Sequence, residues 1–167
     1  MPEQFIRKAH PRDVPAIYNY IDTASRTARV IARTHYELYA NIRDFFVFDE
    51  GNGVQGCCAL HVTWHDLAEV KSLVVDPSLR GRGIGKYLVE AALEEARTLK
   101  LQRVFALTNV EGFFQKLGFQ IVDKHELPQK IWGECVRCPR FPDCDEIAVV
   151  YYTGISADST VDLPILV

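Results

Sequence analysis

The stretch Leu73-Val-Val-Asp-Pro-Ser-Leu-Arg-Gly-Arg-Gly-Ile-Gly-Lys-Tyr-Leu-Val-Glu90 decides the fold of this chain. Its first three residues are apolar and mostly β-branched, which predicts a buried strand that ends at Asp76-Pro77. Apolar residues then recur at the spacing of a helix: Ile84, Leu88, Ala92, Ala96 and Leu99. The sequence therefore predicts a strand, a glycine-rich turn and a helix, in that order.

The glycine-rich turn predicts a binding site for a phosphate-bearing ligand. Three glycines within residues 81–85 remove side chains from the turn, so a ligand can approach the backbone closely. The free N–H groups of the first helical turn favour negative charge, phosphate above all, and two arginines and a lysine add positive charge. The residues that we expect to hold a diphosphate are Arg80, Gly81, Arg82, Gly83, Ile84, Gly85 and Lys86.

Two common nucleotide-binding motifs do not fit this turn. A P-loop requires Ser or Thr after its lysine, whereas Tyr87 follows Lys86. The dinucleotide fingerprint requires its third glycine one residue later than Gly85. The arrangement Arg80-x-x-Gly83-x-Gly85 after a strand resembles instead the coenzyme A-binding motif of the GCN5-related N-acetyltransferase superfamily. The resemblance implies acetyl-CoA as the cosubstrate and no requirement for a metal.

Length and composition predict a single folded domain. The 167 residues are enough to bury a hydrophobic core, and the proportions of hydrophobic (48%) and charged (25%) residues are ordinary for a globular protein. The net charge is −3 without a basic run, so we expect neither nucleic acid nor a membrane as a partner. No apolar stretch is long enough to span a bilayer and no signal-peptide layout is visible, so we expect a cytoplasmic protein.

Strands and helices alternate along the chain. Apolar runs bounded by turn residues predict strands over residues 4–8, 45–48, 54–64, 68–75, 103–108, 119–122 and 147–153. Helical spacing predicts helices that begin at residue 11, lie within 23–43, and cover 84–99 and 110–117. This order is similar to the layout of the acetyltransferase superfamily, which predicts one acetyltransferase domain over residues 1–153 and a C-terminal tail over 154–167.

The resemblance implies an α/β (α+β) fold of defined topology. Its sheet is mixed, mostly antiparallel and seven-stranded, is flanked by about four helices, and is splayed between strands 4 and 5. The splayed strands are those that hold residues 73–75 and 104–107. In that fold the pantetheine arm of acetyl-CoA pairs with the exposed strand edge like an added strand. By position, Leu73, Val74 and Val75 supply this edge.

Longer strings resemble one branch of the superfamily, the short, single-domain N-acetylglutamate synthases of bacterial arginine biosynthesis. These strings are Glu37-Leu-Tyr-Ala-Asn-Ile-Arg-Asp-Phe-Phe46, Asp66-Leu-Ala-Glu-Val-Lys-Ser-Leu73, Phe105-Ala-Leu-Thr108, Phe113-Phe-Gln-Lys-Leu-Gly-Phe119, Leu127-Pro-Gln-Lys-Ile-Trp132 and Cys135-x-x-Cys138-Pro. The resemblance implies acetyl transfer to the α-amino group of L-glutamate, the first step of arginine biosynthesis.

Two departures from that branch leave other acceptors open. The chain has Ala32-Arg33-Thr34 where the family often has Pro-Arg-Ser, and Lys71 where arginine is common. The alternatives are another small amine or amino acid, glutamine and aspartate included, or a protein substrate. A non-enzymatic alternative is a regulatory module that binds acetyl-CoA.

The resemblance and the chemistry together nominate catalytic and substrate-binding residues. Glu69 lies eleven residues before Arg80, where related enzymes place a carboxylate that acts as the general base. The alternative without a catalytic role is a glutamate on the surface or one paired with Lys71. Phe114 stands where the superfamily usually has a tyrosine that acts as the general acid. Arginine and lysine suit the carboxylates of the acceptor, so we expect Arg33 and Lys71 to bind it. Backbone N–H groups at Val74 or Val75 are the expected oxyanion donors.

The five cysteines predict no metal site. Cys135-x-x-Cys138 has the spacing of half a zinc site and Cys144 offers a third thiolate, but a fourth ligand is not evident. Reduced thiols are the favoured interpretation, with zinc as the alternative. Cys57 and Cys58 lie within a predicted strand and are expected to be small buried hydrophobic residues.

The expected binding partner is a small amino acid that serves as substrate. A homodimer is an open alternative for the oligomeric state, since dimers are the commonest oligomers.

Overall fold

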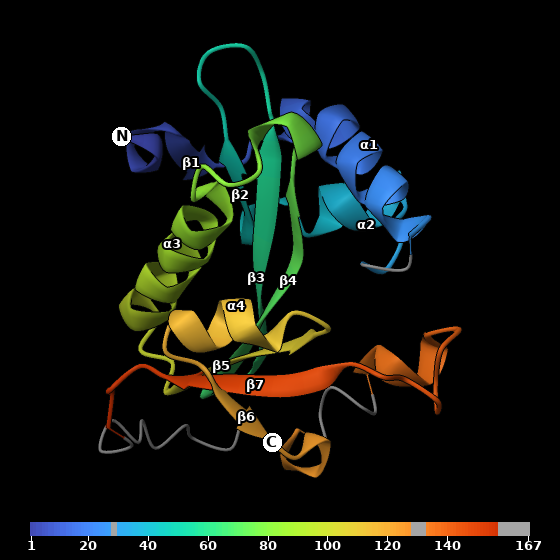
Figure 1. The fold of residues 1–167 in the computed structure, drawn as a ribbon, viewed down its shortest axis with the longest axis vertical. Coiled ribbons are helices and arrows are strands. Elements are labelled where there is room, and N and C mark those ends of the chain that lie inside the picture. Colours follow the sequence, from blue (N-terminus) through green and yellow to red (C-terminus); the bar gives the residue numbers. More distant parts are fainter. Residues whose placement is uncertain (28–29, 128–132, 157–167) are drawn as a thin grey trace, which may run out of the picture.

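The computed structural model describes residues 1–27, 30–127 and 133–156 (Figure 1). The α-helices are α1 (Val14–Ser25), α2 (His35–Ala40), α3 (Ile84–Thr98) and α4 (Glu111–Lys116). The strands are β1 (Ile6–Lys8), β2 (Phe45–Phe48), β3 (Gly56–Trp64), β4 (Leu67–Val75), β5 (Arg103–Thr108), β6 (Gln120–Val122) and β7 (Ile147–Tyr152). Short 3-10 helices lie at Pro2–Phe5, Pro11–Asp13, Ile42–Asp44, Pro77–Leu79, Lys124–Glu126 and Cys135–Arg137.

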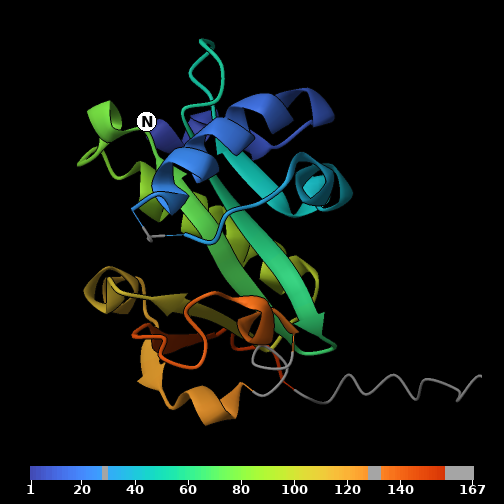
Figure 2. The ribbon, with the colours of Figure 1, turned by 90° about the vertical axis from the view of Figure 1, so that its right-hand side faces the viewer.

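The seven strands form one mixed sheet in the order β1-β2-β3-β4-β5-β7-β6. Only β4 and β5 pair in parallel among the described strands; the other neighbours are antiparallel. One core cluster packs α3 and α4 against one face of the sheet, and a second packs α1 and α2 against the other. Figure 2 shows α1 and α2 on the near side of β3 and β4 and α3 on the far side. The predicted sheet and its helical layers are confirmed.

The sheet divides between β4 and β5. Their ladder joins Leu67 to Arg103, Ala68 to Val104 and Glu69 to Phe105. Beyond this third pair, no ladder joins the two strands within the described part of the chain, and the two halves of the sheet diverge (Figure 1). One edge of β4 over residues 70–75 is therefore open, as the predicted splay requires.

A β-bulge in β4 decides which side chains face α1. Cys57 pairs with Val74 and Ala59 with Lys71, so β4 has one extra residue between these pairs. Ser72 lies in the bulge with φ at 54°, a left-handed conformation that costs energy for a residue with a side chain. Because side chains alternate along a strand, the bulge reverses the alternation. Lys71 and Val74 thus share the α1 side, and Val74 packs with the core there.

The interpretation of residues 73–75 as a buried strand is wrong in one respect. Leu73, Val74 and Val75 belong to β4, but all three are only partly buried. Their strand edge borders the gap between β4 and β5, where no neighbouring strand covers them. The apolar character of this run thus reflects packing against helices on both faces rather than burial within a continuous sheet.

Helix α3 confirms most of the predicted apolar stripe. Ile84, Leu88, Ala92 and Ala96 are buried against the sheet. Leu99 is an exception, because α3 ends at Thr98 and the Leu99 side chain is 51% exposed. The chain turns at Lys100, where φ is 59°, and Leu101 takes up the core position instead.

The polar region before β2 is less helical than its composition suggests. Helix α1 continues to Ser25, and in the described part of the region that follows the second α-helix covers His35–Ala40. Thr34 caps α2, since its side chain accepts a hydrogen bond from the Glu37 backbone N–H and the Glu37 carboxylate bonds back to Thr34. This cap holds Arg33, the residue before it, at the start of α2.

The N-terminal strand is also shorter than predicted, since residues 2–5 form a 3-10 helix and β1 covers only 6–8. None of the helices in the described residues has the length and apolar character that crossing a bilayer requires. The boundary between domain and tail after residue 153 stays a prediction, because residues 157–167 lie outside the described part of the chain.

Candidate functional site

The end of β4 is tied to α1 by a hydrogen-bonded aspartate. The Asp76 carboxylate accepts bonds from the backbone N–H and the hydroxyl of Ser78, at 2.9 and 2.6 Å. It also accepts a bond of 2.8 Å from the hydroxyl of Tyr20 on α1. Burial, together with the bond to Asp76, raises the pKa of Tyr20 to about 12, so the phenol stays protonated and keeps donating. The strand end and the following turn are therefore held in place.

Two glycines give the turn after β4 its conformation. Gly81 and Gly83 have φ values of 85° and 79°, a region that favours glycine because it has no Cβ. Gly83 precedes the first residue of α3 and provides no side-chain cap, and the first helical bond runs from the Tyr87 N–H to the Gly83 carbonyl at 3.1 Å. The N–H groups of residues 84–86 precede that bond, so the start of α3 can hold an anion such as a diphosphate.

The placement of Gly85 in the turn is wrong, whereas its contact with the coenzyme stays a prediction. Gly85 is the second residue of α3 rather than part of the turn. A Cβ at Gly85 would lie 3.6 Å from the Phe113 ring and 3.9 Å from the Val75 side chain. Gly85 therefore borders the segment around α4 and the end of β4, and it does not shape the turn.

The three cations around the turn are not equivalent. Arg82 forms an ion pair with Glu50 on the β2–β3 connection, with Arg82 Nη2 at 2.7 Å from Glu50 Oε1. The hydrogen bond from Arg82 lowers the pKa of Glu50. Lys86 lies 3.7 Å from Glu90, one helical turn further along α3. Arg80 instead lines a cavity beside β4. The structure thus places Arg80 where a ligand can meet it directly.

That cavity brings together predicted residues and residues that the sequence analysis missed. Its volume is about 410 Å³. From the predicted site it is lined by Val74, Val75 and Arg80, and from α1 and the segment after it by Asn19, Tyr20, Thr23, Ala24 and Thr27, with Pro77 between them. The contribution of α1 has no signal in the sequence, since its polar face is indistinguishable from an ordinary solvated helix face.

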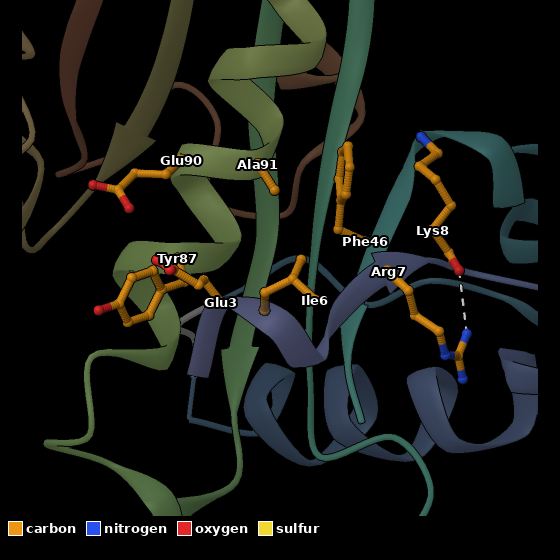
Figure 3. Close-up of a pocket in the computed structure, with 8 residues that line it drawn as sticks. All are labelled: Glu3, Ile6, Arg7, Lys8, Phe46, Tyr87, Glu90 and Ala91. Atoms are coloured by element: carbon orange, nitrogen blue, oxygen red, sulfur yellow. Dashed lines mark hydrogen bonds between the residues drawn. The ribbon is translucent and has the colours of Figure 1, made fainter. Parts of the chain in front are cut away.

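A second cavity of about 460 Å³ lies between the N-terminal segment, β2 and α3 (Figure 3). Among its lining residues, Lys8 is paired with Glu95 at 2.9 Å and Arg7 with Asp13 at 2.7 Å. The Lys8 ammonium also lies 4.3 Å from the centre of the Phe46 ring. No residue predicted to bind coenzyme or acceptor lines this cavity.

Glu69 occupies the point at which the sheet divides. It is the last residue of β4 that pairs with β5, opposite Phe105, and it pairs with His61 on β3. Its side chain is only 4% exposed, so the alternative that Glu69 is a surface residue is wrong. His61 Nδ1 lies 2.6 Å from an Asp44 carboxylate oxygen. A carboxylate at this position borders the gap between β4 and β5, where it can act as a base.

Arg33 and Lys71 meet at one carboxylate. Arg33 Nη1 and Nη2 donate to the two carboxylate oxygens of Glu134, at 3.2 and 3.1 Å. Lys71 Nζ donates to Oε1 of the same group at 2.6 Å. We refer to these three residues as the Arg33–Lys71–Glu134 cluster. Arg33 and Lys71 were both predicted to bind the acceptor, whereas Glu134 was not predicted, and its only signal in the sequence is its position beside the Cys135-x-x-Cys138 string.

Phe114, at the position where related enzymes usually have a tyrosine as general acid, is a core residue. The Phe114 side chain is 4% exposed and packs edge-on against Phe113 and Phe119, with ring centres 5.1 Å apart in each pair. Such a side chain has no proton to donate. Protonation of a departing thiolate therefore depends on water or on another group.

The cysteines form two separate groups. Cys57 and Cys58 are fully buried, as predicted, and burial raises the pKa of the Cys57 thiol to about 12. Cys135, Cys138 and Cys144 are half-buried and are not joined by a disulfide. Within the ranges that the structure describes, no three His, Cys, Asp or Glu side chains are grouped so that they could hold a metal ion. The zinc alternative thus has no support in these residues.

Comparison with known proteins identifies the family. Residues 41–121 match the acetyltransferase (GNAT) domain. An uncharacterized N-acetyltransferase of Chlorobaculum tepidum is 38% identical over 145 residues, which are 87% of this chain and 94% of the relative. The chain belongs to the GNAT acetyltransferase family. The predicted class, an N-acetyltransferase that uses acetyl-CoA, is thereby confirmed.

Two further relatives of this GNAT enzyme have more specific names. The amino-acid acetyltransferase of Mycobacterium tuberculosis is 36% identical over 135 residues, which are 79% of this chain and 77% of the relative. N-acetylglutamate synthase from Neisseria gonorrhoeae, solved with coenzyme A and N-acetyl-glutamate, superposes with a TM-score of 0.80 at 27% identity. That match covers 89% of this chain but only 34% of the longer synthase.

Proposed function

We propose that this GNAT enzyme transfers the acetyl group of acetyl-CoA to the α-amino group of L-glutamate, the first step of arginine biosynthesis, in the cytoplasm. The observation that carries the proposal is the convergence of Arg33 and Lys71 on one carboxylate, on the face of β4 that also bears Glu69. Relatives named amino-acid acetyltransferase support a free amino acid as the acceptor. The gonococcal synthase with N-acetyl-glutamate supports glutamate.

The coenzyme, in this proposal, binds along β4 and the following turn. The pantetheine arm pairs with the open edge formed by Leu73, Val74 and Val75, since β5 does not reach it. The diphosphate lies at the start of α3, where Gly81 and Gly83 keep the turn free of side chains. The residues around the diphosphate are Arg80, Gly81, Arg82, Gly83, Ile84, Gly85 and Lys86. Open space around Gly81, where a Cβ would meet no atom within 4 Å, fits this placement.

The proposed reaction is direct attack of the acceptor nitrogen on the thioester carbonyl. The new N–C bond forms as the C–S bond breaks, and the bonding electron pair leaves with the sulfur as thiolate. Glu69 takes the proton that the nitrogen loses, while a backbone N–H at Val74 or Val75 donates to the carbonyl oxygen. Phe114 cannot protonate the thiolate, so we assign that step to water.

A panel of amino acids tests the acceptor. Release of free thiol from acetyl-CoA is measured with L-glutamate, L-glutamine, L-aspartate and other amino acids, and with a peptide that carries lysine. We expect the highest kcat/KM with L-glutamate. A preference for the peptide would identify a protein acetyltransferase. Binding of acetyl-CoA without thiol release for any acceptor would instead identify a regulatory module.

Substitutions at the two cations test how the acceptor carboxylate binds. Arg33→Ala should raise KM for L-glutamate by roughly 10- to 100-fold, because each hydrogen bond between charged groups contributes about 1.5–3 kcal/mol. Lys71→Ala should raise it less, since lysine makes one contact where arginine makes two. KM for acetyl-CoA should not change.

Arg33→Lys is the matched control. It keeps the positive charge but loses the guanidinium group that can bind a carboxylate through two hydrogen bonds, so an intermediate KM for L-glutamate is expected. Melting temperatures show whether each variant is folded. If both alanine variants acetylate L-glutamate normally, the acceptor carboxylate binds elsewhere.

L-glutamine is the second candidate acceptor, and the Arg33–Lys71–Glu134 cluster favours it. Glu134 balances one of the two positive charges of Arg33 and Lys71, so the three side chains together carry one net positive charge. One positive charge suits an acceptor with an α-carboxylate and an uncharged side chain. The ratio of kcat/KM for L-glutamine and L-glutamate decides between the two acceptors.

A further inference from the structure

We propose that Glu134 occupies the place of an acceptor carboxylate and leaves it when an acidic acceptor binds. The segment 133–146 is then a displaceable cover of the acceptor site, and Glu134 sets the affinity of the enzyme for acidic amino acids. This inference rests on the proposed function for the identity of the acceptor. It goes beyond that proposal because it assigns a role to a residue of the enzyme that competes with the substrate.

The geometry of the cluster is that of a bound substrate carboxylate. Both oxygens of Glu134 face the two terminal nitrogens of Arg33, which is the bidentate arrangement that guanidinium and carboxylate favour. Lys71 adds a third bond to the same group at 2.6 Å. The side chains of Arg33 and Lys71 are only 14% and 15% exposed, so little of either cation remains for a second carboxylate.

Exchange is electrostatically preferable to addition. A second carboxylate beside Glu134 would place two like charges within a few ångströms of each other, in surroundings that screen them poorly. Replacing Glu134 with a carboxylate of the acceptor leaves the net charge around Arg33 and Lys71 unchanged. When no acceptor is present, Glu134 balances one of the two positive charges of these adjacent, largely buried cations, which gives its carboxylate a role in the free enzyme.

The segment that carries Glu134 is held by side chains rather than by the sheet. The regular element that lies wholly within residues 133–146 is the short 3-10 helix Cys135–Arg137, and none of these residues belongs to a strand of the described sheet. Arg140 pairs with Glu146 at 2.8 Å, and Lys124 Nζ bonds to the Cys144 carbonyl at 3.1 Å. Moving the segment around Glu134 therefore breaks no strand pairing.

Glu134→Gln tests the inference directly. The substitution keeps the size of the side chain and removes the competing charge. We expect KM for L-glutamate to fall by roughly tenfold, because the apparent affinity of a site rises when a competing closed state is removed. KM for acetyl-CoA should stay unchanged. Asp145→Asn is the matched control: it removes the same charge from the same segment, at a side chain that is 79% exposed, and should leave both constants unchanged.

Hydrogen exchange of the parent enzyme provides a second readout. Peptides from residues 133–146 should exchange faster when L-glutamate is added to the complex with acetyl-CoA, because Glu134 has been displaced. Slower exchange of these peptides on addition of L-glutamate would show that the segment closes over the acceptor instead, and would overturn the inference.

The outcomes separate this inference from the proposed function. A higher or unchanged KM for L-glutamate in Glu134→Gln, in an enzyme that acetylates glutamate, overturns the inference and leaves the proposed function intact. A parent enzyme that prefers a neutral amino acid, together with a Glu134→Gln variant that gains activity on L-glutamate, overturns the glutamate proposal and supports the inference. If neither the parent enzyme nor Glu134→Gln acetylates any amino acid, both the inference and the proposed function are overturned.

Discussion

Replacing Glu69 with glutamine is expected to lower kcat by roughly 100-fold or more, the usual contribution of a positioned general base. The variant keeps the shape of a side chain that is only 4% exposed and removes its ability to accept a proton. Glu69 is suited to this role because it is the last residue of β4 that pairs with β5, where the gap between the strands opens. Steady-state kinetics with saturating acetyl-CoA and acceptor measure the effect.

The pH profile gives a sharper test of the same role. A base must be deprotonated to act, so kcat/KM of the parent falls as the pH drops through the pKa of its essential base in the free enzyme. Glu69→Gln should lack this acidic limb. Glu94→Gln on α3 is the matched control, because its carboxylate is 74% exposed and lies near the C-terminal end of the helix; it should keep both rate and profile. A loss below about threefold for Glu69→Gln would mean that another group removes the proton.

Replacing Gly83 with valine is expected to weaken acetyl-CoA binding by roughly 100-fold or more. A branched side chain would enter the space in which the diphosphate meets the first N–H groups of α3, and each lost bond to a charged group costs about 1.5–3 kcal/mol. Gly83 has a φ of 79°, so valine also strains the backbone there, and its Cβ would lie 3.5 Å from the Tyr87 ring. Calorimetric titration with acetyl-CoA measures the loss.

The strain requires a control that separates misfolding from blocked binding. Gly154→Val adds the same side chain at a φ of 82°, beyond the end of β7, where a Cβ would meet no atom within 4 Å. We expect both variants to lose some stability in thermal unfolding and only Gly83→Val to lose coenzyme affinity. Unchanged affinity in a folded Gly83→Val variant would contradict the placement of the diphosphate.

The local pattern of the sequence was sufficient for the core of the fold. The run before Asp76, the glycines of the turn and the apolar stripe from Ile84 to Ala96 all act through neighbours within a few residues of each other. Such features depend on backbone preferences and on the period of one strand or helix, which the sequence displays directly. The same holds for the family strings, from which the acetyltransferase class followed.

Details at the ends of elements were less predictable. Leu99 fits the helical period but is exposed, because the chain leaves the helix one residue earlier. The bulge at Ser72 has no local signal either, since serine is not a residue that favours a positive φ. Its effect is nonetheless large, because it determines that Lys71 and Val74 point to the same face of β4.

Only the tertiary structure brought the residues of the proposed acceptor site together. Arg33 and Glu134 are 101 residues apart in the chain, and Lys71 and Glu134 are 63 apart. Tyr20 and Asp76 are separated by 56 residues and meet at the end of β4. The sequence by itself therefore determined the class of enzyme and the glycine-rich turn at which we propose that the coenzyme binds, because both depend on residues that are close to one another in the chain. The tertiary structure decided which carboxylate the two cations hold, because that contact depends on how distant segments pack around the divided sheet.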